Sequence, residues 1–369
     1  MKFTARVDEL NNALSKMVKI ASGNRQQILN HILIEAKDRL LTLTVNNLEM
    51  AITISIDADV LIEGKFTLPA VRFSQIVVSS KKQVTVEIIE SEAIITEGKS
   101  KIKIQGISAS EFPKPKTTEL DFFEIDSQVF LNGLTKTVYA TDHINSNSVL
   151  NAVSLNIDNN KIEMAATDGN RLASYENEIQ LDKTLTALIP RDTALELIKL
   201  CPKQGNISLS LNQNSIYFMF DQLFFISRLL EGQYPRYKQL IPHHNENIAQ
   251  INTADLITAL KKINIILGVA KVENTGKNYK INITNFKFTD NNLSISYKSS
   301  EGDLSEELGC IYSGQDLSIN FSFNYVLDVL KLIETKDVCF KMGGALSSAL
   351  ILPTSEERFT NLIMPTQIR

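Results

Sequence analysis

The sequence predicts an α+β fold in which one unit of antiparallel sheet with two helices occurs three times. A strand followed by an amphipathic helix recurs at regular distances, a second helix follows in each copy, and short alternating segments separate the helices. The first apolar positions of the leading helices, Leu10, Phe130 and Leu256, lie 120 and 126 residues apart. A chain of 369 residues therefore divides into three domains, predicted at 1–120, 121–247 and 248–369.

The first copy begins with a strand at residues 3–7, and Asp8 is positioned to cap a helix over residues 8–20. A second helix is expected over residues 70–82, because proline favours the start of a helix and Pro69 precedes it. Short alternating segments predict the other strands, at residues 40–45, 51–56, 84–89, 93–96 and 101–107.

The second copy repeats this order, with a strand at residues 123–125 and a helix over 126–139. Pro190 opens its second helix, which is expected over residues 191–203. Its other strands are predicted at residues 153–157, 161–166, 206–211, 216–220 and 224–229.

The third copy has a strand at residues 249–251 and helices over 253–263 and 322–336. Its other strands are predicted at residues 279–283, 293–297 and 338–341. Segments that combine an aromatic residue with proline, at 111–115 and 232–237, end the first two copies and suit extended linkers. A duplication that never closes into an assembly is the alternative.

An Asp-Gly turn followed by an Asn-Arg pair stands in the segment Ala-Thr-Asp-Gly-Asn-Arg-Leu-Ala at residues 166–173. Asp-Gly supplies the positive φ that a tight hairpin turn needs. We expect Arg171, directly after the turn, to leave the sheet and line a neighbouring groove. The alternative is an ordinary turn with a solvated arginine.

Charge is unevenly distributed over the predicted elements. The chain has a formal net charge of −4, whereas the six predicted helices together carry +5, which leaves −9 for the remainder. If the helices share one side of the layer, that side tolerates a polyanion and the sheet side repels it. Solvated helix faces with chance lysines are the alternative.

Several classes of protein are not supported. Cys201, Cys310 and Cys339 are widely spaced and show neither a disulfide framework nor a zinc motif. The first residues have no apolar signal core and no run is long enough to span a membrane, so we expect a cytoplasmic protein without metal or cofactor. Nucleotide-binding and hydrolase motifs are missing, although Asp168 near Arg171 leaves a hydrolase or transferase as an alternative.

The threefold repeat, the 166–173 segment and the terminal Met364-Pro365 together resemble the bacterial DNA polymerase III β subunit, the sliding-clamp family. The resemblance covers essentially the whole chain, and further stretches that carry it lie at residues 47–50, 68–70, 110–113, 189–191, 232–237 and 324–330. It implies a non-catalytic processivity factor for DNA replication. Two chains would close head to tail into a six-domain ring, with sheets outside and helices facing duplex DNA of any sequence.

The resemblance also implies site residues. Basic candidates for DNA contact are Arg25, Arg72, Arg191, Lys199 and Lys203. The dimer would place Ile102 and Ile104 of one chain against Ile266 and Leu267 of the other. A groove between the central and C-terminal domains would bind short peptide motifs through Leu150, Thr167, Gly169, Asn170, Arg171, Leu172, Pro235, Gln239, Leu240, Ser348, Leu362, Ile363, Met364, Pro365 and Thr366.

Those motifs would belong to the replicative polymerase subunit, the clamp loader, other polymerases and repair factors. Asn170 stands where the best-studied members have histidine and Gln239 where they have arginine, so one cationic edge of the groove is absent. Besides the clamp and the enzyme, a monomeric repeat scaffold that binds only peptides is the third alternative.

Overall fold

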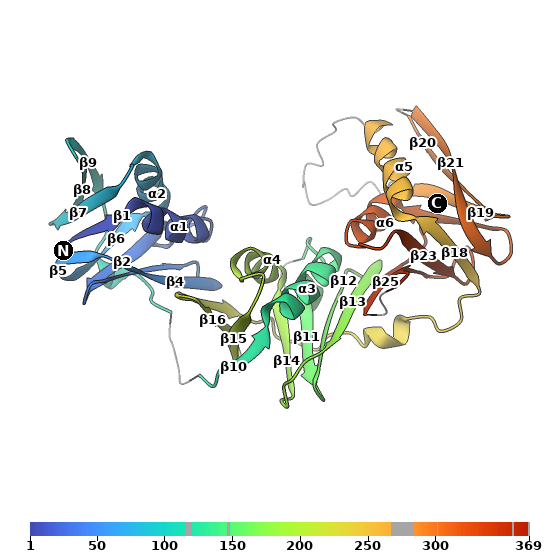
Figure 1. Cartoon of the computed structure of the whole chain (residues 1–369), viewed down its shortest axis with the longest axis horizontal. Helices are drawn as coiled ribbons and strands as arrows, with labels where there is room; N and C mark the ends of the chain where they lie inside the picture. The colour runs from blue at the N-terminus through green and yellow to red at the C-terminus, as the bar shows by residue number, and fades with distance from the viewer. Residues whose placement is uncertain (116–119, 146–147, 267–282, 301, 356–357, 368–369) are drawn as a thin grey trace. The chain divides into compact units, whose positions relative to one another are not determined.

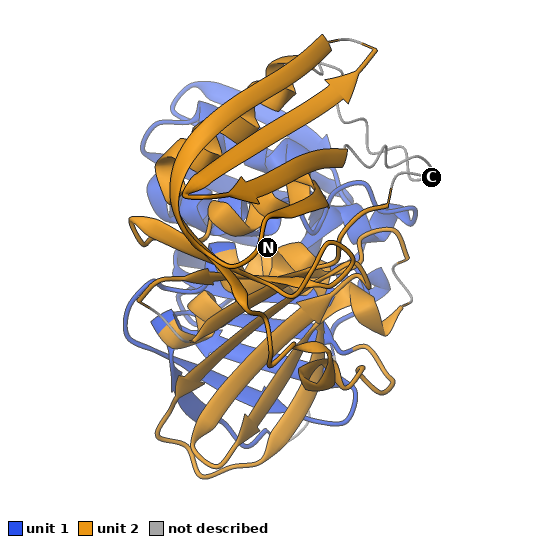
Figure 2. Cartoon of the chain, turned by 90° about the vertical axis from the view of Figure 1, so that its right-hand side faces the viewer, with its two compact units in different colours: residues 1–128, 199–229 blue, residues 129–198, 230–369 orange. Residues whose placement is uncertain are grey.

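A computed structural model of the chain describes residues 1–115, 120–145, 148–266, 283–300, 302–355 and 358–367. Contacts divide the chain into two compact units: Met1–Gln128 with Lys199–Leu229 form unit 1, and Val129–Ile198 with Leu230–Arg369 form unit 2 (Figure 2). The central repeat contributes strands to both units. The domain boundaries at 120/121 and 247/248 divide the chain by repeat rather than by contact, and they stay a prediction.

Unit 1 contains two antiparallel sheets (Figure 1). The five-stranded sheet has the order β5-β1-β7-β8-β9, from Asp59–Ile62, Lys2–Arg6, Gln83–Ile89, Glu92–Glu97 and Ser100–Gln105. The eight-stranded sheet has the order β10-β15-β16-β17-β4-β3-β2-β6, from Phe123–Asp126, Asn206–Leu211, Ser215–Phe220, Leu223–Arg228, Met50–Asp57, Leu40–Asn46, His31–Lys37 and Gly64–Pro69.

The eight-stranded sheet joins the first repeat to the central one. Strand β4 of the first repeat pairs with β17 of the central repeat, with Ile54 opposite Leu223. Helices α1 (Val7–Met17) and α2 (Ala70–Ser79) pack against each other and bury Leu10, Leu14 and Phe73. The core of unit 1 therefore lies between these helices and the sheets.

Unit 2 contains one twelve-stranded antiparallel sheet. The central repeat contributes β14-β11-β12-β13, from Leu185–Pro190, Ala152–Asp158, Lys161–Thr167 and Arg171–Glu178. The C-terminal repeat continues it with β25-β24-β23-β18-β21-β20-β19-β22, from Phe359–Ile363, Ala349–Pro353, Asp337–Met342, Asn247–Asn252, Gly302–Ser313, Asn292–Ser299, Ile283–Thr289 and Leu317–Ser322. Strand β13 pairs with β25, with Tyr175 opposite Phe359.

The predicted fold class is confirmed, because each repeat has two helices and antiparallel strands. The helices of the later repeats are α3 (Ser127–Thr137), α4 (Arg191–Leu200), α5 (Thr253–Ile266) and α6 (Phe323–Leu330). Several helices are shorter than expected. Helix α2 ends at Ser79 and not at residue 82. The hydroxyls of Ser79 and Ser80 both donate to the Ile76 carbonyl, and the backbone of Ser80 is extended, so the helix stops there.

The predicted cap at Asp8 is wrong. Arg6 occupies the cap position and its side chain makes no capping hydrogen bond. Asp8 lies within the first turn of α1, where a carboxylate interacts favourably with the helix dipole, and it accepts a 3.1 Å hydrogen bond from Arg6 Nε. The arginine before the helix thus binds the aspartate that was expected to cap it.

Ten strands were not predicted: β2, β5, β6, β13, β14, β19, β21, β22, β24 and β25. Strand β21 shows the reason most clearly, because its side chains alternate between half-buried and exposed over twelve residues and include Asp303, Glu306 and Glu307. Such a strand has no apolar run to identify it. The predicted strand at 279–283 lies outside the described residues except for Ile283, which begins β19.

His31 predicts a pH dependence for the stability of unit 1. Its side chain is 3% exposed at the start of β2, and burial lowers its pKa more than hydrogen bonding to Thr67 raises it. As the pH falls, His31 therefore takes up a proton in the unfolded chain at a higher pH than in the folded chain. The free energy of unfolding consequently falls as the pH drops through about 6.5. We expect His31→Gln to lose part of this dependence in urea unfolding between about pH 7.5 and about pH 5.5. The exposed His243→Gln is the matched control, and identical pH profiles would contradict the assignment.

Candidate functional site

The hairpin at residues 167–171 is confirmed, and its geometry follows from three side chains. Thr167 pairs with Leu172 across β12 and β13, and Gly169 takes a φ of +87° between them. Asp168 Oδ1 accepts hydrogen bonds from the amides of Asn170 and Arg171, at 2.9 and 3.0 Å. The Thr167 hydroxyl donates to the Arg171 carbonyl over 2.6 Å. Asp168 therefore serves the turn itself.

The Arg171 side chain is buried, with 6% of it exposed. Its Nε donates to Asp168 Oδ2 over 3.0 Å, and its Nη1 donates to Asp328 Oδ2 of α6 over 2.9 Å. The guanidinium also lies between two rings, 5.3 Å from the centroid of Tyr139 and 4.5 Å from that of Tyr325. Arg171 is therefore neither a solvated arginine nor a residue at the open edge of a groove. Arg171 positions the hairpin.

Electrostatics keeps this arginine charged. Burial lowers the pKa of Arg171, but the carboxylates of Asp168 and Asp328 raise it by more, so its pKa lies above the ordinary value. Burial raises the pKa of Tyr139, which stays a donor and bonds Asn361 Oδ1 over 2.6 Å. Asn361 is fully buried and its Nδ2 donates to the Ile351 carbonyl. These contacts connect the central and C-terminal repeats within unit 2.

The segment after β25 runs beside the hairpin. The Met364 amide donates to the Asn170 carbonyl over 2.8 Å, and the Thr366 amide donates to the Asn320 carbonyl of β22 over 2.8 Å. Both ends of residues 364–366 are thereby held by main-chain hydrogen bonds. The Met364 side chain remains 45% exposed next to the turn.

An apolar cluster lies next to the hairpin and this C-terminal segment. Leu172, Leu350 and Leu362 are buried together, and Tyr237 and Ile241 pack against them. The linker reaches the hairpin as well, because the Thr167 amide donates to the Tyr234 hydroxyl over 3.0 Å. We call this cluster, with the hairpin, the linker and residues 364–366, the unit 2 groove, after the peptide groove that the resemblance implies.

The predicted groove residues fall into three groups. Those with exposed side chains or backbone are Gly169, Asn170, Pro235, Gln239, Leu240 and Met364. Partly exposed are Leu150, Ser348, Pro365 and Thr366, and buried are Thr167, Arg171, Leu172, Leu362 and Ile363. The prediction omitted Tyr234, Tyr237, Ile241 and Leu350. Tyr234 and Tyr237 lie on either side of Pro235 in the linker. This aromatic pair is the feature of the sequence that could have identified them as part of the site.

The basic candidates are mostly exposed, but the helices are less basic than predicted. Arg25 lies in the loop after α1, Arg72 on α2, Lys199 on the last turn of α4 and Lys203 beyond it. Arg191 starts α4, with Nη1 3.8 Å from Asp192 Oδ1. The six helices hold seven basic and six acidic residues, a net of +1 instead of +5. The missing lysines, at positions 81, 82, 203, 331 and 336 among others, follow the helix ends.

The predicted interface residues that the structure describes lie on the edge strand of a sheet and at the end of a helix. Ile102 and Ile104 are on β9, where Ile102 is exposed and Ile104 is partly exposed. Ile266 is the last residue of α5 and is half-buried. Leu267 lies outside the described residues.

Neither a metal site nor a membrane span occurs in the part of the chain that the structure describes. No three side chains of the His, Cys, Asp or Glu type come together as a metal site among the described residues. The helices described here are all too short or too polar to cross a membrane.

Comparison with known proteins gives one consistent family. Residues 1–116, 124–236 and 238–367 match the N-terminal, central and C-terminal domains of the DNA polymerase III beta subunit. The beta sliding clamps of Synechococcus elongatus and Bacillus subtilis are 29% and 26% identical to this chain, with full coverage of both partners.

Solved structures show the same fold at lower identity. The DNA polymerase sliding clamp of Pseudomonas aeruginosa superimposes with a TM-score of 0.91 at 23% identity, and both chains are fully covered. The beta sliding clamp of C. crescentus has a TM-score of 0.90 at 22% identity over both full chains, and its structure holds polyethylene glycol at a candidate beta-motif tethering region.

The buried Arg171 pair predicts a large loss of stability on substitution. In Arg171→Met, Asp168 and Asp328 lose their cation, and we expect the free energy of unfolding to fall by about 3–5 kcal/mol. Arg171→Lys should recover only part of it, because an ammonium cannot replace the fork and the flat stacking surface. The control is Arg358→Met, an exposed arginine in the same unit that donates to Asn177, for which about 0–1 kcal/mol is expected. Equal losses in urea unfolding for the Arg171 and Arg358 variants would contradict this role.

Proposed function

The chain belongs to the DNA polymerase III beta subunit family, the beta sliding clamps, and we propose that it encircles duplex DNA and holds the replicative polymerase on its template. The observation that carries the proposal is the threefold repeat of sheet and two helices, matched in order to the three clamp domains. The Asp168–Arg171 pair, which the enzyme alternative required, is used by the hairpin and the core. The protein is accordingly a processivity subunit without a catalytic centre.

Closure into a ring requires two complementary edges. Strand β9 is an edge strand in which Lys101 and Lys103 alternate with Ile102 and Ile104. In the described part of the chain, residues 302–309 of β21 pair only with β20, because β18 pairs from Cys310 onward. An unpaired edge is a template for a strand of another chain. We infer that β9 of one protomer adds to β21 of its partner.

Charge and packing support that pairing. The free half of β21 carries Asp303, Glu306 and Glu307, opposite in sign to the lysines of β9. Gly302 begins this half, and a Cβ there would lie 3.2 Å from Ile266 Cγ2. The α5 end therefore packs directly on the proposed edge. Two such heterologous contacts, related by a twofold axis, close a ring of two chains.

Encirclement changes what the DNA contacts must do. A closed ring cannot leave the duplex sideways, so contacts to phosphate need only centre it and can stay sequence-independent. Helices with a net charge of +1 and exposed Arg25, Arg72, Lys199 and Lys203 are consistent with weak contacts of this kind. We infer that these residues and Arg191 face the duplex.

Topological retention tests the ring. We expect the protein, once loaded, to stay on nicked circular DNA and to be lost rapidly when the circle is linearised, as followed by gel filtration of the complex.

The variant Ile104→Asp places a carboxylate in the proposed strand pairing. It should shift the mass measured by sedimentation towards that of one chain and abolish retention on circular DNA. Equal loss of the wild-type protein from circular and linear DNA would refute encirclement.

The unit 2 groove is the proposed binding site for partner peptides. Its apolar cluster of Leu172, Leu350 and Leu362 offers a floor for large apolar anchors, and the exposed Met364 and Leu240 are available to the same guest. The polyethylene glycol at the corresponding kind of region in the C. crescentus clamp supports this proposal. We infer that the replicative polymerase, the clamp loader and other replication or repair proteins compete for it in the cytoplasm.

Met364 gives the sharpest test of the groove. Its side chain is 45% exposed while its amide is bonded to Asn170, so Met364→Asp changes the surface without removing the main-chain contact. We expect a partner-motif peptide to lose at least tenfold in affinity by fluorescence anisotropy, about 1.4 kcal/mol. Met219→Asp is the matched control, because Met219 is 44% exposed on β16 of unit 1. Unchanged affinity in Met364→Asp, with the dimer intact, would rule out the assignment.

A further inference from the structure

Unit 1 and unit 2 contain the same joint between two repeats within one sheet, built from different side chains. In unit 2, β13 pairs with β25, with Arg171 opposite Ile363 and Tyr175 opposite Phe359. In unit 1, β4 pairs with β17, with Met50 opposite Ser227 and Ile54 opposite Leu223. Both joints keep the same four-residue spacing between these pairs. Ile54 and Leu223 therefore occupy the positions that Tyr175 and Phe359 occupy in unit 2.

The leading helix places a lysine at the same position in both joints. Lys16 on α1 and Lys136 on α3 are 120 residues apart, the spacing that separates Leu10 from Phe130. In unit 2 the Lys136 Nζ lies 5.4 Å from the ring centroids of both Tyr175 and Phe359. Both rings are buried. This joint is filled by a cation held between two aromatic side chains.

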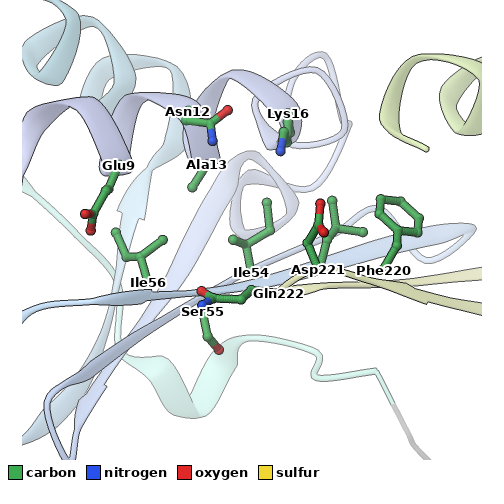
Figure 3. Close-up of a pocket in the computed structure, with 11 residues that line it drawn as sticks. Glu9, Asn12, Ala13, Lys16, Ile54, Ser55, Ile56, Phe220, Asp221 and Gln222 are labelled. Atoms are coloured by element: carbon green, nitrogen blue, oxygen red, sulfur yellow. The ribbon is translucent and has the colours of Figure 1, made fainter. Parts of the chain in front are cut away.

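In unit 1 the rings are absent and a cavity of about 290 Å³ remains. Figure 3 shows it between α1, which carries Glu9, Asn12 and Lys16, and the strand residues Ile54 and Ile56. The turn between β16 and β17 closes one side, and we call this cavity the α1 pocket; it is lined by Glu9, Asn12, Ala13, Lys16, Ile54, Ser55, Ile56, Phe220, Asp221, Gln222 and Leu223.

The lining divides into an apolar floor and a polar rim. Ile54, Phe220 and Leu223 are buried beneath the cavity, as a flat hydrophobic guest requires. No hydrogen bond or ion pair within the described residues takes up the ammonium of Lys16. Asn12 and Gln222 on the rim each offer an amide donor and an amide acceptor, the two groups that a peptide backbone also presents.

We propose that the α1 pocket takes one aromatic side chain of a partner polypeptide, with the ring on Ile54 and Leu223 beneath the Lys16 ammonium. The guest supplies the ring that unit 2 supplies for itself, and the rim amides bond its main chain. A cavity of about 290 Å³ is at the small end of ligand sites, which suits one ring and not a nucleotide. The site lies in unit 1 and is independent of the unit 2 groove.

Methyl NMR on the full-length protein tests this directly, with N-acetyl-phenylalanine amide as the probe. A ring seated on the floor should shift the Ile54 and Leu223 methyl resonances upfield, with saturation. Lys16→Met should weaken binding roughly threefold through loss of the cation–π contact. Lys19→Met, an exposed lysine just beyond α1, is the matched control and should bind as the wild type does.

Two further variants distinguish binding in the α1 pocket from binding elsewhere on the chain. Ile54→Tyr with Leu223→Phe rebuilds the unit 2 arrangement. Because this variant removes both reporter methyl groups, binding is read from the Ile56 methyl resonance, which should shift in the wild type and should not shift in the double variant. Met364→Asp, in the unit 2 groove, should leave the methyl shifts unchanged. The proposal is overturned if the wild-type methyl resonances show no saturable shift, if Lys16→Met binds as tightly as Lys19→Met, or if free phenol binds and the capped amino acid does not. If the double variant does not unfold cooperatively, and so is not properly folded, the comparison of Lys16→Met with Lys19→Met decides whether the proposal holds.

Discussion

The pairing of β13 with β25 is the constraint on which the unit 2 groove depends. A slip of one residue would exchange the two faces of the strand and move Leu172 out of its cluster with Leu362. The buried Arg171 opposes such a slip, because its guanidinium meets Asp168 and Asp328 in one register only. A buried ion pair of this kind contributes less to net stability than to a unique arrangement, since desolvation offsets much of its attraction. Its effect at this joint is to hold the turn that positions Asn170 against Met364.

The same joint is filled in unit 2 and open in unit 1. In unit 2, Tyr175, Phe359 and Lys136 fill the space beneath α3. The surface proposed for binding in that unit lies instead at the hairpin, the linker and the C-terminal segment. In unit 1 the pair is aliphatic and the space beneath α1 stays open. The backbone arrangement is shared, so the difference lies in two side chains, Tyr175 against Ile54 and Phe359 against Leu223. Duplicated domains can acquire separate binding sites in this way without a change of fold.

Local signals allowed the repeat, all six helices and the 167–171 hairpin to be predicted, because periodicity and turn chemistry act over a few residues. The partners of Arg171 were beyond such reasoning, since Asp328 lies 157 residues away and only the fold brings it near. Strand β21 was not predicted, because its alternating polar residues give a sequence like that of a loop. The helix charge was overestimated for a local reason as well. Serine hydroxyls end α2 before Lys81 and Lys82, a competition with the backbone that composition does not reveal. The peptide-site residues came from family resemblance, which is why the linker tyrosines were omitted.

The small helix charge has a consequence for how the clamp works. A chain of net charge −4 with helices near neutrality has little long-range attraction for DNA, so its residence on the duplex must come from closure. In the interface that we propose, closure relies on the lysines of β9 and the carboxylates of β21. Lys101, Lys103, Asp303 and Glu307 are exposed and therefore screened by salt. On these proposals, ionic strength would weaken two different steps, the pairing of the edges and the contact with phosphate. Because the second step is already weak, added salt should act on residence mainly by opening the ring.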